Sequence, residues 1–99
     1  MPEYSVKINP RLGSQMVRYA EFIARVSIPA AIRFYEDFSD ILQRLSRNPY
    51  QFPFYDDPNL PSGIYRKALF AKWYKVIFYI EGKEVIVDAV VDGRSGGQG

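Results

Sequence analysis

The chain of 99 residues contains no Cys and no His. This composition excludes disulfides, thiolate metal sites and cysteine nucleophiles, and it removes the side chain best suited to proton transfer near neutral pH. Hydrophobic residues make up 47% of the chain and aromatic residues 16%, which is enough for a packed core and excludes a disordered chain. The length predicts one domain, over residues 1–94, followed by a flexible Gly-rich tail at 95–99.

The formal net charge of +2 does not by itself indicate a nucleic-acid-binding protein. The positive charge is local, however, because the segment from Pro58 to Ile80 contains four cations and no acid. No apolar run approaches the roughly 18 residues that span a bilayer, and the N-terminus lacks the pattern of a signal peptide. We therefore expect a soluble cytoplasmic protein that does not enter membranes.

The first 26 residues predict a strand and a helix. Tyr4 to Ile8 alternates between apolar and polar residues and is typical of a short strand. Asn9 is a good helix N-cap and Pro10 fits a first helical turn, so a helix should begin there. Apolar residues then recur at helical spacing, at Leu12, Met16, Tyr19, Ala20, Ile23 and Val26.

A second helix should begin at Ser27-Ile28-Pro29, almost without an intervening loop, so the two helices should form an antiparallel hairpin. Its predicted buried stripe consists of Ile28, Ala31, Ile32, Tyr35, Phe38, Leu42 and Leu45. Four further apolar residues lie off the main helical stripes, namely Val17, Phe22, Phe34 and Ile41. We interpret Phe34 as completing the core, whereas Val17 and Phe22 are the better candidates for contact with another chain.

The segment from Asn48 to Gly63 contains four prolines and should form a loop that its aromatic residues keep ordered. Three strands are predicted after it, over about Ile64–Phe70, Tyr74–Ile80 and Glu84–Val91, with a tight turn at Glu81-Gly82-Lys83. The predicted fold class is α+β: an N-terminal strand, a two-helix hairpin and a three-stranded antiparallel meander form one sheet that the helices cover on one face.

Strand alternation assigns the side chains to the two faces of this sheet. The core rows should be Tyr74, Val76, Phe78 and Ile80 in one strand and Val85, Val87, Ala89 and Val91 in the next. Lys75, Ile77 and Tyr79 should lie on the open face. If Arg66 also lies there, it joins Lys75, Tyr79, Asp88 and Arg94 in a cationic surface. The alternative, which we favour, is that Asp88 pairs with Lys75 or Arg66 across the strands.

Three strings, NPYQFP, IYRKALFAKWYKVIFYIEGKEVIV and VVDGRS, occur in an order that resembles the RelE/ParE superfamily of bacterial type II toxins, and its plasmid-stabilisation branch in particular. The likeness extends from Tyr4 to about Arg94. It implies a toxin that a cognate antitoxin binds and neutralises, as a homodimer or as a hetero-oligomer with the antitoxin, without a cofactor or metal. An acidic antitoxin segment would contact apolar surface and the cations Arg66, Lys67, Lys75 and Arg94. It would also contact the hydroxyl of Tyr79.

The resemblance leaves two targets open. RelE-like members cleave mRNA on the ribosome, and the matching positions here are Arg66, Ala68, Lys75 and Arg94, with Asp92 as a base. This catalytic set is incomplete, because Ala68 supplies no cation and an exposed carboxylate transfers protons poorly at neutral pH. ParE-like members bind DNA gyrase without known chemistry, and for them Val17 and Phe22 would be partner contacts. We favour the ParE-like function; a third alternative is a non-toxic relic that only binds its antitoxin.

Overall fold

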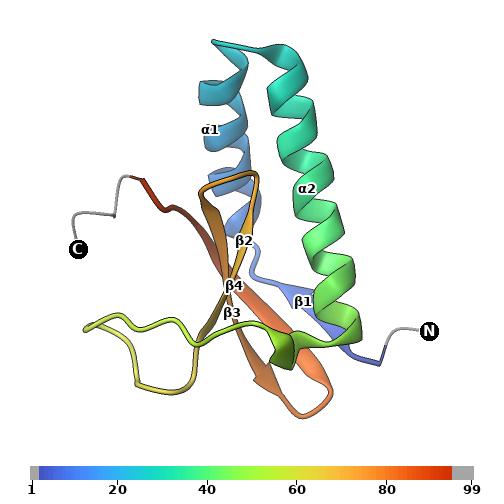
Figure 1. Cartoon of the computed structure of the whole chain (residues 1–99), viewed down its shortest axis with the longest axis vertical. Coiled ribbons are helices and arrows are strands. Elements are labelled where there is room, and N and C mark those ends of the chain that lie inside the picture. Colours follow the sequence, from blue (N-terminus) through green and yellow to red (C-terminus); the bar gives the residue numbers. More distant parts are fainter. Residues whose placement is uncertain (1–2, 95–99) are drawn as a thin grey trace.

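One four-stranded sheet and one pair of helices make up the computed structural model, which describes residues 3–94 (Figure 1). The tail expected at 95–99 lies outside the described residues. The elements follow in the order β1 (Ser5–Ile8), α1 (Leu12–Ala24), α2 (Ile28–Arg47), the 3-10 turn η1 (Pro49–Gln51), β2 (Arg66–Phe70), β3 (Tyr74–Glu81) and β4 (Glu84–Asp92). The strand order is β1-β4-β3-β2, with β1 parallel to β4 and the other pairs antiparallel. The predicted α+β fold class is confirmed.

Local capping explains the helix boundaries. The backbone carbonyl of Asn9 accepts from the N–H of Leu12, so α1 begins three residues after the predicted cap. Ser27 has an extended backbone, and its hydroxyl oxygen accepts from the N–H of Ala30 at 3.2 Å, which caps α2. Pro29 lies in the first turn, where its missing N–H costs nothing. The helical hairpin predicted from the sequence is confirmed, with Arg25 to Ser27 as its connection.

Helix α2 packs the second half of its predicted stripe, at Phe38, Leu42 and Leu45, into the core, but not the first half. Phe34 and Ile41 are buried together with Leu45, whereas Ile28, Ile32 and Tyr35 are 65%, 56% and 44% exposed. Both stripes have helical spacing without a polar interruption, and they share Phe38 and Leu45. In the structure the helix is rotated so that Phe34 and Ile41 face the core, while Ile28, Ile32 and Tyr35 face water.

The sheet buries the row predicted for β3, but β4 contains a bulge that was not predicted. Ile77 pairs with Ala89 and Phe78 pairs with Val87, so Asp88 has no opposite residue on β3. An inserted residue reverses the alternation beyond it. Val85 and Val87 are therefore buried as expected, but Val90 takes the core position beyond the bulge. The predicted core positions of Ala89 and Val91 are wrong for this reason.

Candidate functional site

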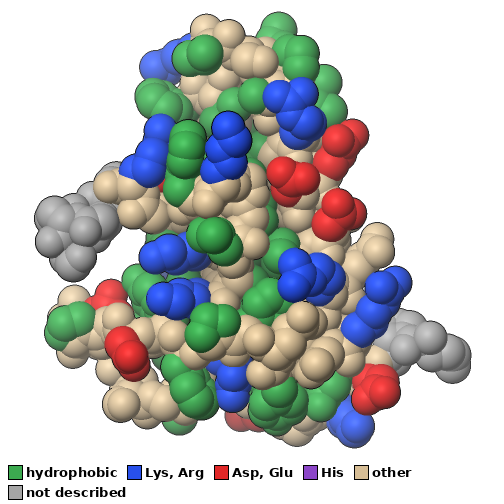
Figure 2. Space-filling view, viewed as in Figure 1, with side chains coloured by type: hydrophobic (Ala, Val, Ile, Leu, Met, Phe, Trp, Pro, Cys, Tyr) green, Lys and Arg blue, Asp and Glu red, His purple; other side chains and the backbone are tan. Residues whose placement is uncertain are grey.

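Cations and hydrophobic side chains lie interspersed over the sheet strands, while acidic side chains gather along the middle of α2 (Figure 2). The helical acids are Glu36, Asp37 and Asp40. The surface is therefore divided into regions of opposite sign even though the net charge is small. The directions of the individual cationic side chains decide what each region can bind.

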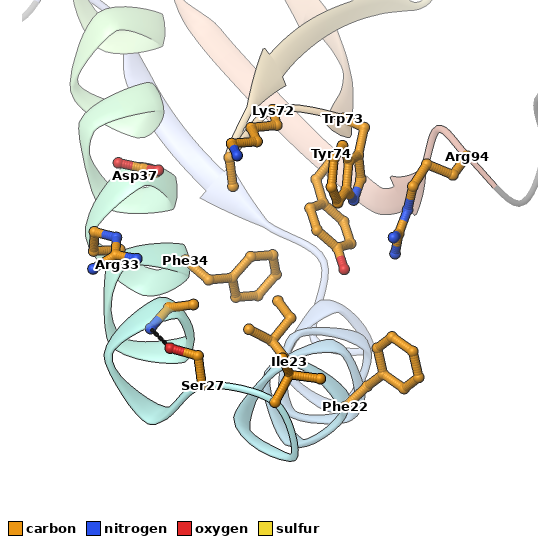
Figure 3. Close-up of a pocket in the computed structure, with 13 residues that line it drawn as sticks. Phe22, Ile23, Ser27, Arg33, Phe34, Asp37, Lys72, Trp73, Tyr74 and Arg94 are labelled. Carbon is orange, nitrogen blue, oxygen red and sulfur yellow. Dashed lines mark hydrogen bonds between the residues drawn. The ribbon is translucent and has the colours of Figure 1, made fainter.

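A groove of ≈ 360 Å³ lies between the tip of the helical hairpin and the β2–β3 turn (Figure 3). Its walls are mostly apolar side chains from three segments, namely Phe22, Ile23, Val26, Ala30, Phe34, Ala71, Trp73 and Tyr74. Charged side chains at Arg33, Asp37, Lys72 and Arg94 complete the lining. The groove continues into exposed apolar surface, because Phe22 is 55% and Val26 88% exposed. The sequence singled out Phe22 and Arg94 but gave no sign that they share one cavity.

The turn that forms one wall of the groove has an uncommon backbone. Ala71 and Lys72 both have positive φ values, 47° and 77°, which are unfavourable for residues with a Cβ. The N–H of Trp73 donates to the carbonyl of Ala71 at 3.0 Å, and this bond holds the turn tight. Trp73 is thereby placed beside Arg94 at the edge of the groove.

Arg94 is held by two contacts at this edge. Its guanidinium donates to Asp92 through Nε at 3.2 Å and Nη2 at 3.0 Å, and it stacks over the ring of Trp73 at 4.2 Å. The hydrogen bond to Asp92 raises the pKa of Arg94 above its usual value. A Cβ on the preceding Gly93 would lie 2.5 Å from the carbonyl oxygen of Trp73, so a side chain there would push the segment away. Asp92 is engaged in this ion pair, which makes it a poor general base.

Arg66 lies on the face that the helices cover, not on the open face. It pairs with Phe78, a core residue, and it alternates in phase with the buried Ala68 and Phe70. Its Nη1 donates to the carbonyl of Phe52 at 2.6 Å. The guanidinium also stacks over the ring of Phe54 at 4.1 Å. Arg66 thus fastens the Asn48–Gly63 loop to β2.

The open face presents Lys75 and Tyr79, as the alternation predicted, and also Lys67, because Arg66 lies on the covered face. Lys67 pairs with Ile77, Lys75 pairs with Leu69 and Val91, and the Tyr79 ring packs edge-on against Tyr65 with centroids 5.4 Å apart. The pKa of Tyr79 is raised, mainly by desolvation and then by Glu81. A phenol with a raised pKa is less suited to proton transfer at neutral pH.

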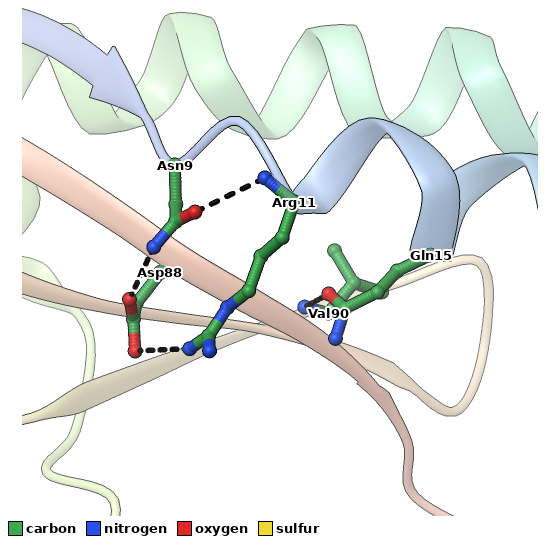
Figure 4. A network of polar contacts seen from close by, with 5 residues as sticks. All are labelled: Asn9, Arg11, Gln15, Asp88 and Val90. Carbon is green, nitrogen blue, oxygen red and sulfur yellow. Dashed lines mark hydrogen bonds and ion pairs between the residues drawn. The ribbon is translucent and has the colours of Figure 1, made fainter.

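Asp88 pairs with neither Lys75 nor Arg66, so the predicted cross-strand pairs are wrong. Its carboxylate accepts from Nδ2 of Asn9 at 3.1 Å and from Nη2 of Arg11 at 3.3 Å (Figure 4). Gln15 accepts from the N–H of Val90 at 3.0 Å beside them. The bulge directs Asp88 to the β1–α1 connection, and the network fixes that connection on β4.

The predicted ribonuclease residues do not form one site. Arg66 and Lys75 point to opposite faces of the sheet, and Arg94 lies in the groove at the hairpin tip. Ala68 is fully buried, so its position offers nothing to a substrate. Among the described residues, no group of three or more His, Cys, Asp or Glu side chains could hold a metal ion.

No protein-family model matches the sequence, and no match was found among curated proteins. A solved structure of the chromosomal ParDE TA system from P. aeruginosa contains a chain with the same fold. Its TM-score is 0.70 and its sequence identity 15%, and the match covers 91% of this chain and 96% of that one. This chain therefore has the fold of a chain from a ParDE system, which is the likeness that the sequence led us to expect. No helix within residues 3–94 is both long and apolar enough to cross a bilayer.

Proposed function

We propose that this protein is the toxin of a bacterial type II toxin–antitoxin module, that it inhibits growth by binding DNA gyrase, and that a cognate antitoxin neutralises it. The observation that carries the proposal is the structural match to a ParDE chain over nearly the full length of both proteins. A gyrase-binding toxin needs complementary surface rather than a set of proton-transfer groups. The exposed apolar residues Val17 and Phe22 supply such surface on α1, at 48% and 55% exposure.

The ribonuclease alternative has less support. Stabilising a phosphorane requires cations that meet at one phosphate. Arg66 is held by the Phe52 carbonyl and the Phe54 ring, and Lys75 points to the opposite face. Arg94 is paired with Asp92. A metal-independent nuclease would have to assemble its site from residues that this fold keeps apart.

The antitoxin is proposed to occupy the groove at the hairpin tip. The walls are apolar, and Lys72 and Arg94 stand on the sheet side of the groove. This combination suits an amphipathic, acidic segment that folds on binding. Lys67, Lys75 and Tyr79 on the open face are a second proposed contact region for the same partner, and the complex would be a hetero-oligomer.

Expression without antitoxin tests the proposed function. Gyrase poisoning should produce filamentous cells and a DNA-damage response, and a Phe22→Asp variant should lose that effect while remaining folded. Rapid arrest of translation with cleaved ribosomal messages would instead favour the ribonuclease. Unaffected growth would favour a relic that only binds antitoxin. If an Arg66→Ala, Lys75→Ala double variant keeps its full toxicity, phosphate binding by these residues plays no part.

A further inference from the structure

A strip of aromatic rings and cations lies at the C-terminal end of α2, the opposite end of that helix from the groove. The strip consists of Tyr4, Tyr50, Phe54, Arg66 and Lys83. The ammonium of Lys83 lies 5.3 Å from the Tyr4 ring, and the Tyr4 and Tyr50 centroids are 6.2 Å apart. The guanidinium of Arg66 lies 5.3 Å from the Tyr50 ring and 4.1 Å from the Phe54 ring. Each member contacts the next, so the aromatic strip is one continuous surface.

The rings of the aromatic strip are open to solvent although their cations occupy one side. Tyr50 is 56% and Phe54 46% exposed, so each ring keeps area for a further planar group. Exposed aromatic rings are costly to leave in water, and core packing does not require these two. Both rings lie outside the buried core.

The backbone holds the aromatic strip in a fixed arrangement. The N–H of Tyr4 donates to the carbonyl of Ser46 at 3.0 Å, Tyr50 lies in η1, and Phe54 forms a β-bridge with Arg66. A ligand would therefore meet rings that are already positioned, which lowers the entropic cost of binding. Lys83 is the cation of the strip that can attract an anion, because the three ion pairs found within residues 3–94 join other residues, whereas Arg66 donates to the Phe52 carbonyl.

We propose that the aromatic strip binds single-stranded nucleic acid. Bases would stack on Tyr50 and Phe54, and Lys83 would attract the phosphates. Stacking platforms flanked by cations are the general chemistry of single-strand binding. A peptide partner would instead require a concave apolar groove with pockets, and that feature is found at the hairpin tip. The inference is independent of the proposed target, because Val17 and Phe22, the proposed gyrase contacts, are not part of the strip.

Fluorescence anisotropy with labelled twelve-nucleotide oligo-dT and oligo-U, and with a twelve-base-pair duplex, tests this site on the full chain. The single strands should bind, the duplex should bind at least about ten-fold more weakly, and the affinity should fall with added salt. Tyr50→Ala and Phe54→Ala should each weaken single-strand binding by about 5- to 100-fold. Phe22→Ala is the matched control, since Phe22 is 55% and Tyr50 56% exposed, and it should leave binding unchanged.

Two further variants separate stacking from general surface effects. Tyr50→Phe should keep the affinity and Tyr50→Leu should lose it, because only the former retains a π-face. Lys83→Gln should reduce the slope of log affinity against log salt by about 0.7, the contribution of one phosphate contact. The proposal is overturned by a dissociation constant weaker than about 100 µM at low salt for both single strands, by equal binding of the duplex, or by an equal loss in Phe22→Ala. Circular dichroism confirms that each variant is folded.

Discussion

Arg66 shows how far a single side chain can differ from its sequence-based interpretation. Its position in a basic stretch made it a candidate phosphate ligand. In the structure, the planar guanidinium donates to the Phe52 carbonyl and stacks on Phe54, so it joins a proline-rich loop to the sheet. Such a contact requires a flat, forked cation, and Lys cannot reproduce it. The main role of Arg66 is therefore structural, because it holds the loop on the sheet.

Replacing Arg66 tests this role. Arg66→Lys keeps the charge but loses the stacked geometry and the short bond to Phe52, and it should lower the free energy of unfolding by about 1–2 kcal/mol. Lys75→Ala on the open face is the control and should change stability by less than about 0.5 kcal/mol. Urea denaturation measures both. Equal stability of Arg66→Lys and the parent would contradict the role of the guanidinium in holding the loop.

At the scale of the element, α2 illustrates how two overlapping apolar stripes compete. Phe34, Phe38, Ile41 and Leu45 contact the sheet, while Ile28, Ile32 and Tyr35 remain exposed. Both sets have helical spacing, so periodicity alone does not choose between them. The exposed set does not line the groove, whose α2 residues, Ala30, Arg33, Phe34 and Asp37, lie on another side of the helix.

Adjacent aromatic residues on α2 provide a direct test of this orientation. Phe34 is 1% exposed, and its ring packs against Tyr19, Phe70 and Tyr74, so Phe34→Ala should cost about 3–5 kcal/mol. Tyr35→Ala should cost less than about 1 kcal/mol, because that ring is 44% exposed. Thermal or urea unfolding distinguishes the two. The reverse order of costs would contradict this orientation of α2.

The bulge in strand β4 changes the faces of the residues that follow it. One extra residue, Asp88, turns the second half of the strand over, so that Val90 enters the core and Asp92 lies opposite the buried Tyr74. Arg11 and Asn9 hold the bulge from outside. The bulge thereby places Asp92 where it pairs with Arg94 beside the groove. Without it, strict alternation would direct the Asp92 carboxylate to the open face.

Over the whole molecule, stability should be greatest in the two central strands. Val76, Phe78, Val85 and Val87 are fully buried, and β3 and β4 each pair on both sides. Native-state hydrogen exchange should therefore be slowest at these amides and faster in β1, a four-residue edge strand. Within the proline-rich loop, the N–H of Tyr55 should exchange more slowly than its neighbours, since it donates to Tyr65 at 2.8 Å. Uniform protection across all four strands would contradict this gradient.

The separation of the cations is also a property of the whole molecule. Arg66 is directed to the covered face, Lys67 and Lys75 to the open face, and Arg94 to the hairpin tip. A chain with local positive charge thus has no single cationic centre among these residues. This arrangement favours binding surfaces over concerted phosphate chemistry.

The sequence by itself determined the element order, the helical hairpin, the row of β3 core residues and the resemblance to the RelE/ParE toxins. These features depend on local periodicity, capping and turn chemistry, which neighbouring residues specify. It also correctly placed Lys75 and Tyr79 on the open face, because β3 is regular throughout its length.

Only the tertiary structure decided the bulge at Asp88, the rotation of α2, the partners of Arg66 and the groove at the hairpin tip. Each depends on residues far apart in the chain: Asp88 meets Asn9 and Arg11, and Arg66 meets the loop at Phe52. Register and packing are set by the competition among all such contacts. One additional residue in a strand therefore moves the side chains that follow it to the opposite faces of the sheet, and no local pattern predicts this.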